Sequence, residues 1–242
     1  MTAKGMEGLC PPPACGRHLE PMAMQEVQDP FQQARDVMVD LIARRGVAHP
    51  AVLKAMRAFP RHELLPAPGR DHAYADRPSP IGFNQTISQP YMVAVMTEAA
   101  AARPGDKILE VGTGSGYQAA ILAAVGAKVF TIEIVPELAL RAKNDLARLG
   151  VTNVTMRAGD GYQGWPEEAS FRAIVVTAAP KSVPPPLLEQ LADGGRLVIP
   201  VGPPWDQYLE VHEKHGQKIE LHRAFAVRFV TMTGEAERRR GD

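Results

Sequence analysis

The sequence predicts an α/β fold: a Rossmann-like, doubly wound and mostly parallel sheet with helices on both faces. Short apolar runs alternate with helix-like segments from residue 107 to residue 201, and such alternation requires right-handed crossovers and parallel strands. A glycine-rich turn directly follows the first of these runs, as expected where a strand end binds a ligand. Two alternating runs near the C-terminus predict an antiparallel edge hairpin.

The N-terminal part predicts short helices before the sheet. From Phe31, apolar residues recur at helical spacing up to a glycine stop at Gly46. Pro50 stands where the first residue of a second helix is expected. We expect this pair to pack on the sheet, with a partial lid over the substrate as the alternative. Residues 60–90 are predicted as a long non-helical stretch, and a connection of that length is usually functional. Pro90 is expected to begin another helix.

The stretch from Lys107 to Gln118 reads Lys-Ile-Leu-Glu-Val-Gly-Thr-Gly-Ser-Gly-Tyr-Gln. Its apolar run, 108–111, is predicted as a buried strand, and 117–125 as the helix that follows. The three glycines allow a tight turn and a close approach of the backbone to a ligand. The free N–H groups at the start of the helix favour negative or polar ligand atoms. The stretch therefore predicts a nucleotide-type cradle.

The glycine spacing departs from the dinucleotide fingerprint G-x-G-x-x-G/A. Counted from Gly112, the last position of that pattern falls on Tyr117, which is too large for close helix–strand packing. One acid, Glu110, lies inside the first strand, and a second, Glu133, ends the next apolar run. The second position is where an acid meets the hydroxyls of a ribose. This combination resembles the S-adenosylmethionine site of Rossmann-like methyltransferases.

The rest of the chain completes the predicted sheet. Each predicted helix ends at a glycine, which is a common helix stop. The predicted helices run from Pro136 to Leu149, stopped by Gly150, and near 185–192, stopped by Gly194 and Gly195. The predicted strands are 129–133, 153–157, 171–177, 196–201, the hairpin 208–214 with 218–223, and a last strand 225–230.

Length and composition limit the class of protein. A chain of 242 residues can hold one large α/β domain with an N-terminal addition. Lysine plus arginine equals aspartate plus glutamate at 27 each, so no global field attracts nucleic acid or a membrane. No apolar run reaches about 18 residues, and no continuous hydrophobic segment marks a secretory signal. We expect a cytoplasmic monomer without nucleic-acid or membrane partners.

The domain organisation follows from the same patterns. Residues 1–27 contain three consecutive prolines and no apolar period, and are predicted as a disordered tail. Residues 28–242 are predicted as one domain. Its parts are the N-terminal helices and substrate loop (28–103), the cofactor-binding core (104–205) and the C-terminal strands (206–233). Cys10 and Cys15 have four residues between them, which is not a C-x-x-C pair, and no histidine–cysteine cluster supports a metal.

The segment before the glycine loop carries the most specific motifs. They are Ala73-Tyr-Ala-Asp76, Pro80-Ile-Gly82 and Gln85-Thr-Ile-Ser-Gln-Pro-Tyr-Met92. Together with Leu109 to Tyr117, they resemble the protein-L-isoaspartate O-methyltransferase family. The resemblance extends to residues 177–180, 194–202 and 227–230 and covers roughly residues 31–233. Three positions depart from the family pattern: Ser79 for a leucine, Asn84 for a glycine, and Thr231 for a common proline.

The resemblance implies methyl transfer from S-adenosylmethionine to the free carboxylate of L-isoaspartyl residues in damaged proteins and peptides. S-adenosyl-L-homocysteine is the implied product, and repair continues through a succinimide. An α-carboxyl has a reference pKa of about 3.3–3.7, so it is ionised at neutral pH and needs no general base. Positioning alone can contribute about 7–11 kcal/mol. The alternatives are a methyltransferase for small molecules or RNA, and a catalytically silent scaffold that binds the cofactor or a partner.

The resemblance also assigns residues. Ser88 would orient the substrate carboxylate, with capping of the helix at Pro90 as the alternative. Glu133 would accept the ribose hydroxyls, and Asp160 the adenine amino group unless it only forms an Asp-Gly turn. Glu110 is expected to brace the glycine loop. The complete cofactor set is Glu110, Gly112, Thr113, Gly114, Ser115, Gly116, Glu133, Asp160 and Gly161, and the substrate set is Gln85, Thr86, Ile87, Ile199, Pro200 and Val201. The histidines show no ligand-like spacing and are expected at the surface.

Overall fold

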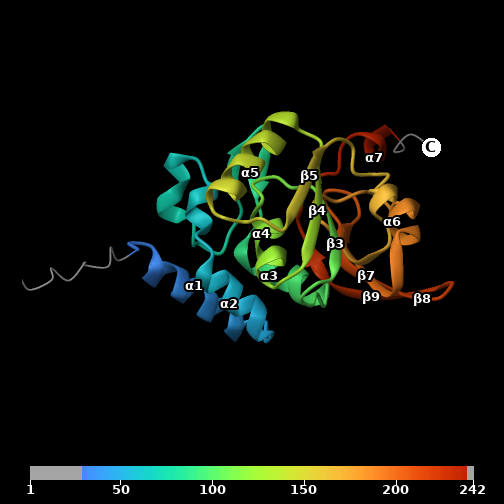
Figure 1. Cartoon of the computed structure of the whole chain (residues 1–242), viewed down its shortest axis with the longest axis horizontal. Helices are drawn as coiled ribbons and strands as arrows, with labels where there is room; N and C mark the ends of the chain where they lie inside the picture. Colours follow the sequence, from blue (N-terminus) through green and yellow to red (C-terminus); the bar gives the residue numbers. More distant parts are fainter. Residues whose placement is uncertain (1–28, 239–242) are drawn as a thin grey trace, which may run out of the picture. The chain divides into compact units, whose positions relative to one another are not determined.

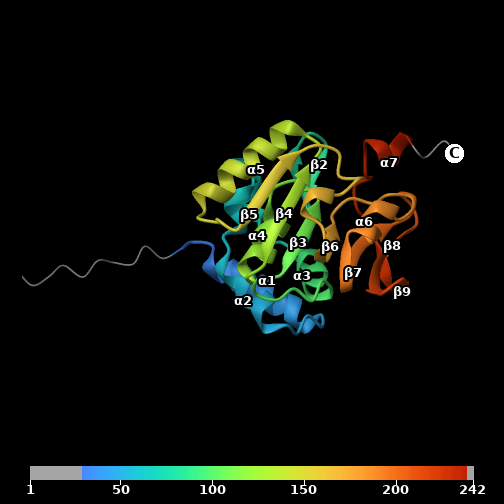
Figure 2. The same ribbon diagram turned by 45° about the vertical axis from the view of Figure 1, so that its right-hand side comes forward.

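Seven strands form the central sheet of the computed structural model. They are β3 (Lys107–Val111), β4 (Lys128–Glu133), β5 (Val154–Ala158), β6 (Phe171–Val176), β7 (Leu191–Val201), β8 (Gln207–His215) and β9 (Lys218–Val227). The sheet order is β5-β4-β3-β6-β7-β8-β9, and Figure 1 shows β5, β4 and β3 next to one another. Strands β3 to β7 pair in parallel, whereas β8 and β9 pair antiparallel at one end (Figure 2). The predicted fold class is confirmed.

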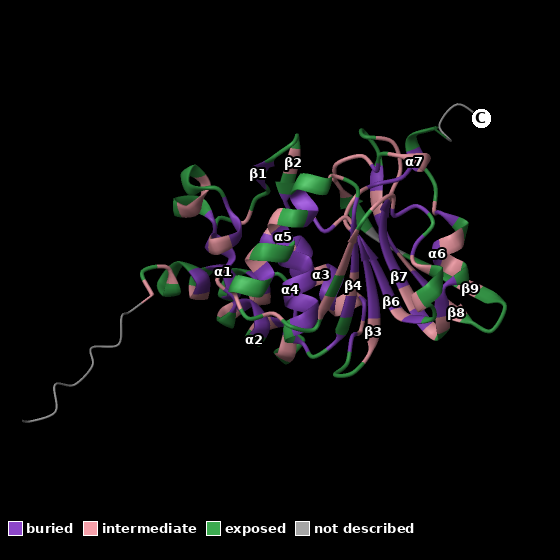
Figure 3. Ribbon diagram, turned by 45° about the horizontal axis from the view of Figure 1, so that its top comes forward, coloured by how far each residue is buried: buried purple, intermediate pink, exposed green. Residues whose placement is uncertain are grey.

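The structure describes residues 29–238, and one compact unit begins at Phe31. The tail predicted at 1–27 lies outside the described residues. The helices are α1 (Gln32–Arg44), α2 (Pro50–Ala58), α3 (Pro90–Ala99), α4 (Tyr117–Ala124), α5 (Pro136–Arg148), α6 (Pro185–Glu189) and α7 (Glu235–Arg238). Helices α1 to α5 lie on one side of the sheet, and α6 and α7 lie on the other (Figure 3).

The inner strands are apolar on both faces because helices cover both sides. In β6, Ala173 and Val175 face the core under α1 to α5, whereas Ile174 and Val176 face the core under α6. The strand order reverses between β3 and β6, since the chain first adds strands on one side of β3 and then on the other. In open α/β sheets, ligands bind beyond the carboxyl ends of the strands at such a reversal.

The prediction that residues 60–90 are non-helical is wrong. The segment contains two 3₁₀ helices and a small hairpin, whose elements are too short to show a periodic apolar pattern. Asn84 has φ 55° at the hairpin turn, a left-handed conformation that asparagine tolerates. The elements are η1 (Arg61–Leu64), η2 (Ala67–His72), β1 (Ser79–Gly82) and β2 (Gln85–Ile87).

Two boundaries near the C-terminus also differ from the prediction. Helix α6 ends at Glu189, and Gly194 and Gly195 lie within β7 rather than after a helix. The predicted last strand 225–230 is not separate, because β9 continues through a register shift to Val227 and the chain then leaves the ladder. Long β7 and β9 are fixed by pairing with β8, which local sequence does not reveal.

His62 and His212 are 8% and 7% exposed, so the prediction that the histidines lie at the surface is wrong for these two.

Within the part of the chain that the structure describes, no helix has the length and apolar character needed to span a membrane.

Candidate active site

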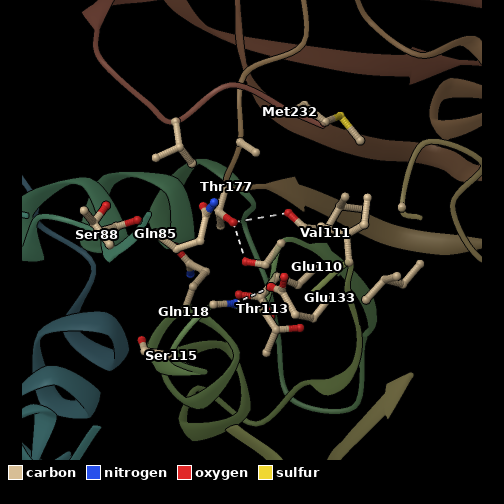
Figure 4. Close-up of a pocket in the computed structure, with 18 of the residues that line it drawn as sticks. Gln85, Ser88, Glu110, Val111, Thr113, Ser115, Gln118, Glu133, Thr177 and Met232 are labelled. Carbon is tan, nitrogen blue, oxygen red and sulfur yellow. Dashed lines mark hydrogen bonds between the residues drawn. The ribbon is translucent and has the colours of Figure 1, made fainter. Parts of the chain in front are cut away.

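A pocket lies beyond the carboxyl ends of β3, β4 and β6, at the reversal of strand order (Figure 4). It encloses about 800 Å³ of space that is partly open to solvent. It brings together predicted residues from separate segments of the chain. Those that line it are Gln85, Thr86, Ile87, Ser88, Glu110, Gly112, Thr113, Gly114, Ser115, Glu133, Asp160 and Gly161.

The glycine loop wraps the end of β3 in a conformation that side chains would block. Gly112 has φ 96°, and a Cβ there would lie 2.5 Å from Thr177 Oγ1. Gly116 does not line the pocket. It precedes α4 with φ 84°, and a Cβ there would lie 3.2 Å from Leu146. Gly112 therefore lets the loop pack closely against Thr177 after β6, and Gly116 lets α4 begin close to α5.

Glu133 holds the glycine loop to the end of β4. Its side chain is nearly buried, and Oε2 accepts the Gly114 N–H at 2.7 Å while Oε1 accepts the Val135 N–H at 2.9 Å. A carboxylate has about four acceptor positions. Glu133 can therefore accept ligand hydroxyls while it keeps both backbone contacts.

Glu110 is completely buried in β3 and contacts the loop through two hydroxyls. Thr131 Oγ1 donates to Glu110 Oε2, and the Thr131 and Thr113 hydroxyls are hydrogen-bonded at 2.5 Å. Glu110 Oε1 has no hydrogen-bond partner among the described residues. Burial is the main cause that raises the pKa of Glu110 to about 8, and the nearby Glu133 contributes in the same direction while the Thr131 hydrogen bond opposes it. Glu110 is therefore a neutral acid at pH 7, joined to the loop through Thr131 and Thr113.

The raised pKa of Glu110 predicts pH-dependent stability. Its pKa of about 8 in the folded chain exceeds the value of about 4.3 for an unfolded chain, so the folded state holds the extra proton between these values. The stability from this group is complete below about pH 4.3 and is lost as the pH rises through about 8. We expect the melting temperature of Glu110→Gln to depend less on pH across this window. Melting curves of both proteins at several pH values test this, and equal slopes would exclude Glu110 as the titrating group.

Asp160 joins the pocket to the C-terminal segment. Its Oδ1 accepts the Tyr162 N–H at 3.0 Å, which forms the Asp-Gly turn given as the alternative role of Asp160. Its Oδ2 accepts the Glu235 N–H at 2.7 Å at the start of α7. Asp160 also lines the pocket. The turn is therefore present, and it leaves the carboxylate at the pocket wall.

Ser88 does not cap α3. The N-cap residue is Gln89, which makes no side-chain capping bond. Asp76 performs this role from a distance: its Oδ1 accepts the Tyr91 N–H at 3.0 Å, and Gln89 Nε2 donates to Oδ2 at 2.9 Å. Among the described residues, the Ser88 hydroxyl has no hydrogen-bond partner. Figure 4 shows Ser88 beside Gln85 on one side of the pocket, so the capping alternative is wrong.

A second, more open cavity continues from the pocket, and we call it the flanking groove. It shares Thr86, Ser88, Thr177 and Val230 with the pocket. The substrate loop, α3 and the segment after β9 therefore meet at this opening. The residues that line the groove are Arg45, Pro78, Thr86, Ser88, Gln89, Tyr91, Met92, Thr177, Phe225, Ala226, Val227, Arg228, Phe229 and Val230.

Sequence reasoning missed Thr177 and the segment 230–233 as parts of the site. Ala179 N–H donates to Val230 O at 2.8 Å, and Met232 N–H donates to Ala179 O at 2.9 Å. These bonds bring the C-terminal segment to the end of β6. The motif at Thr177 could have indicated a site residue, because it matches the family pattern. The bonds between Ala179 and residues 230 and 232 join segments about fifty residues apart, and such contacts leave no local pattern in the sequence.

The strand end 199–201 lies apart from both cavities. Ile199, Pro200 and Val201 line neither the pocket nor the groove. Ile199 is fully buried under α6, and β8 pairs along one edge of this segment, with Pro200 opposite Leu209. Substrate contact by these three residues stays a prediction.

Three comparisons with known proteins agree. The family model described as Protein-L-isoaspartate(D-aspartate) O-methyltransferase matches residues 32–237. A relative from Gloeobacter violaceus named Protein-L-isoaspartate O-methyltransferase is 56% identical, covering 82% of this chain and 98% of its own. One of the same name from a Picosynechococcus species is 54% identical, covering 86% of this chain and 94% of its own.

Solved structures give the same result. One named protein-L-isoaspartate O-methyltransferase has a TM-score of 0.78 at 29% identity, and the match covers 86% of this chain and 69% of that one. A beta-aspartate methyltransferase from Plasmodium falciparum, in complex with S-adenosyl-L-homocysteine, has a TM-score of 0.72 at 26% identity. That match covers 82% of this chain and 98% of the other.

Proposed function

The chain belongs to the protein-L-isoaspartate(D-aspartate) O-methyltransferase family, and we propose how its own residues take part in the methyl transfer. It is an S-adenosylmethionine-dependent enzyme that methylates the free carboxylate of isoaspartyl residues and so begins their repair. The observation that carries the proposal is the Ser88 hydroxyl, unpartnered among the described residues, where the pocket opens into the flanking groove.

We propose that the pocket holds the cofactor. Gly112 lets the loop pack closely against Thr177, which also lines the pocket, and Glu133 lies at the tip of β4 with acceptor positions to spare for ribose hydroxyls. Asp160 stands at the pocket wall with its carboxylate fixed by two backbone N–H groups, where it can accept the adenine amino group. When bound, S-adenosylmethionine supplies an electrophilic methyl group on a sulfonium. These features fit a nucleoside with a polar ribose edge.

We propose that Ser88 donates its hydroxyl to one oxygen of the isoaspartyl carboxylate and turns the other toward the pocket. The acid is ionised at neutral pH, so Ser88 orients and neither attacks nor removes a proton. Gln85, Thr86 and Ile87 form the adjoining wall, and their contact excludes water from the reacting oxygen. Positioning of this kind contributes about 7–11 kcal/mol in well-oriented reactions, which accounts for a site without a nucleophile–base pair.

The proposal is tested with a pair of peptides that differ only in the linkage at one residue. We expect radiolabelled methyl to pass from S-adenosylmethionine to the isoaspartyl peptide and not to its aspartyl twin. The twin is the control for general carboxyl methylation. Equal labelling of both peptides, or of neither, would contradict the proposed roles of the loop and the groove.

The contact between Asp160 and α7 leads to a prediction about cofactor affinity. A Cβ on Gly234 would lie 2.3 Å from Asp160 Oδ2, so Gly234→Ala should displace this carboxylate. We expect S-adenosylmethionine binding to weaken by about two- to tenfold, the order for one lost hydrogen bond.

Gly150→Ala is the matched control for Gly234→Ala. Gly150 has φ 74° against 76° for Gly234, but no atom lies within 4 Å of its added Cβ. The control therefore carries the backbone strain without the displaced carboxylate. Calorimetric titration of both variants decides the point, and equal affinities would remove Asp160 from the cofactor site.

A further inference from the structure

The flanking groove carries an excess of positive charge. Arg45 and Arg228 line it, and none of the described residues that line it is acidic. The chain as a whole has a formal net charge of zero, so this is a local feature of the groove. A cleft lined by charge of one sign attracts ligands of the opposite sign.

The two arginines differ in whether a nearby acid compensates their charge. Arg45 is paired with Asp76, and its guanidinium lies 3.6 Å from the centre of the Tyr91 ring. Arg228 is exposed, and its side chain forms no ion pair or hydrogen bond with the described residues. Arg228 therefore supplies the uncompensated charge of the groove.

The backbone that carries Arg228 is held in place. Its neighbour Phe229 is bound on both sides by one side chain, since Gln207 Oε1 accepts the Phe229 N–H at 2.7 Å and Gln207 Nε2 donates to Phe229 O at 3.3 Å. Val230, the next residue, accepts the Ala179 N–H at 2.8 Å. Arg228 thus projects from an anchored segment at the opening where Ser88 lies, and not from a free loop.

We propose that Arg228 is a specificity-determining residue that favours substrates with an acidic side chain next to the isoaspartyl residue. This rests on the proposed function, because a chain whose carboxylate reaches Ser88 must pass through the groove that continues from it. The aromatic rings of Tyr91 and Phe225, 6.5 Å apart, give the groove an apolar wall. The charge of Arg228 then discriminates among the polar neighbours of the isoaspartyl residue.

The test uses isoaspartyl peptides that differ at one neighbouring position, occupied by Glu, Gln or Lys, with the position tried on each side. We expect kcat/KM to fall in the order Glu, Gln, Lys, with about two- to fivefold between successive peptides, as for an exposed ion pair. The difference should appear in KM, and should shrink as salt is added because exposed charges are screened.

Variants at Arg228 test whether its charge sets the preference among the three peptides. Arg228→Gln should remove the preference for Glu, and Arg228→Glu should reverse it in favour of Lys. The matched control is Arg103→Gln, since Arg103 is exposed, lies before the amino end of β3 and lines neither cavity; it should keep the original order. Equal use of the three peptides by the unchanged enzyme, or a Glu preference that survives Arg228→Glu, would overturn the inference. If no isoaspartyl peptide is methylated, the proposed function fails and the inference fails with it.

Discussion

Replacing Glu133 by alanine is expected to weaken S-adenosylmethionine binding by about 1–3 kcal/mol, the range for buried polar groups left unsatisfied. The substitution removes the proposed ribose acceptor and also the partner of the Gly114 and Val135 N–H groups. Both losses act on the pocket, because the Gly114 contact fixes the loop to the end of β4. We therefore expect a larger effect from Glu133→Ala than from any single change at the pocket rim.

Calorimetric titration measures the affinity, and a melting curve separates loss of binding from loss of fold. Glu137→Ala is the matched control, because Glu137 is exposed in the first turn of α5 and does not line the pocket. It should bind the cofactor as the unchanged enzyme does. An unchanged affinity for Glu133→Ala would remove Glu133 from the cofactor site, whatever happens to the melting temperature.

The elements predicted best are those whose own residues determine them. The run in β6 is apolar at every position from Ala173 to Val176 because both faces of that strand are covered, and such a run is visible in the sequence. The prolines that begin α2, α3 and α5 stand at the first helical position, where proline fits without loss. Local chemistry was sufficient for these elements.

The elements predicted poorly depend on distant partners. Gly194 and Gly195 looked like a helix stop, but they lie inside β7, where the pairing with β6 shifts register between Leu191 and Arg196. Asp76 stands 14 positions before Pro90 and yet holds the start of α3. The short elements within 60–90 show no periodic apolar pattern in the sequence, and contacts with other parts of the fold determine them.

The same distinction applies to the candidate site. Gly112, Gly114 and Glu133 belong to one continuous strand–turn–helix–strand unit, and the structure places them around one pocket as predicted. Arg228 and the segment 230–233 reach the site through the bonds that Gln207 and Ala179 make with the chain after β9. Their position could not be read from local sequence because it is set by the return of the chain after β9.

Replacing Ser88 by alanine is expected to lower turnover of an isoaspartyl peptide about 10- to 100-fold, equivalent to roughly 1.4–2.8 kcal/mol of transition-state stabilisation. The reason is loss of the hydroxyl that orients the carboxylate, so cofactor affinity should not change. Stability should not change either, because Asp76 and not Ser88 holds the start of α3. Asp76→Ala is the matched comparison and should cost about 0.5–2 kcal/mol of stability.

Ser88→Asn sharpens the test, because asparagine keeps a polar side chain at this position but is bulkier where the carboxylate must enter. We expect Ser88→Asn to melt like the unchanged enzyme and to transfer methyl poorly. Melting curves, cofactor titration and peptide turnover on Ser88→Ala, Ser88→Asn and Asp76→Ala give distinct patterns for orientation and for capping. Near-normal turnover in both Ser88 variants would mean that the carboxylate is oriented by the backbone of the loop 85–88 or by Thr86, which also lines both cavities. A drop in melting temperature for Ser88→Ala as large as that for Asp76→Ala would assign the residue to the fold and not to the reaction.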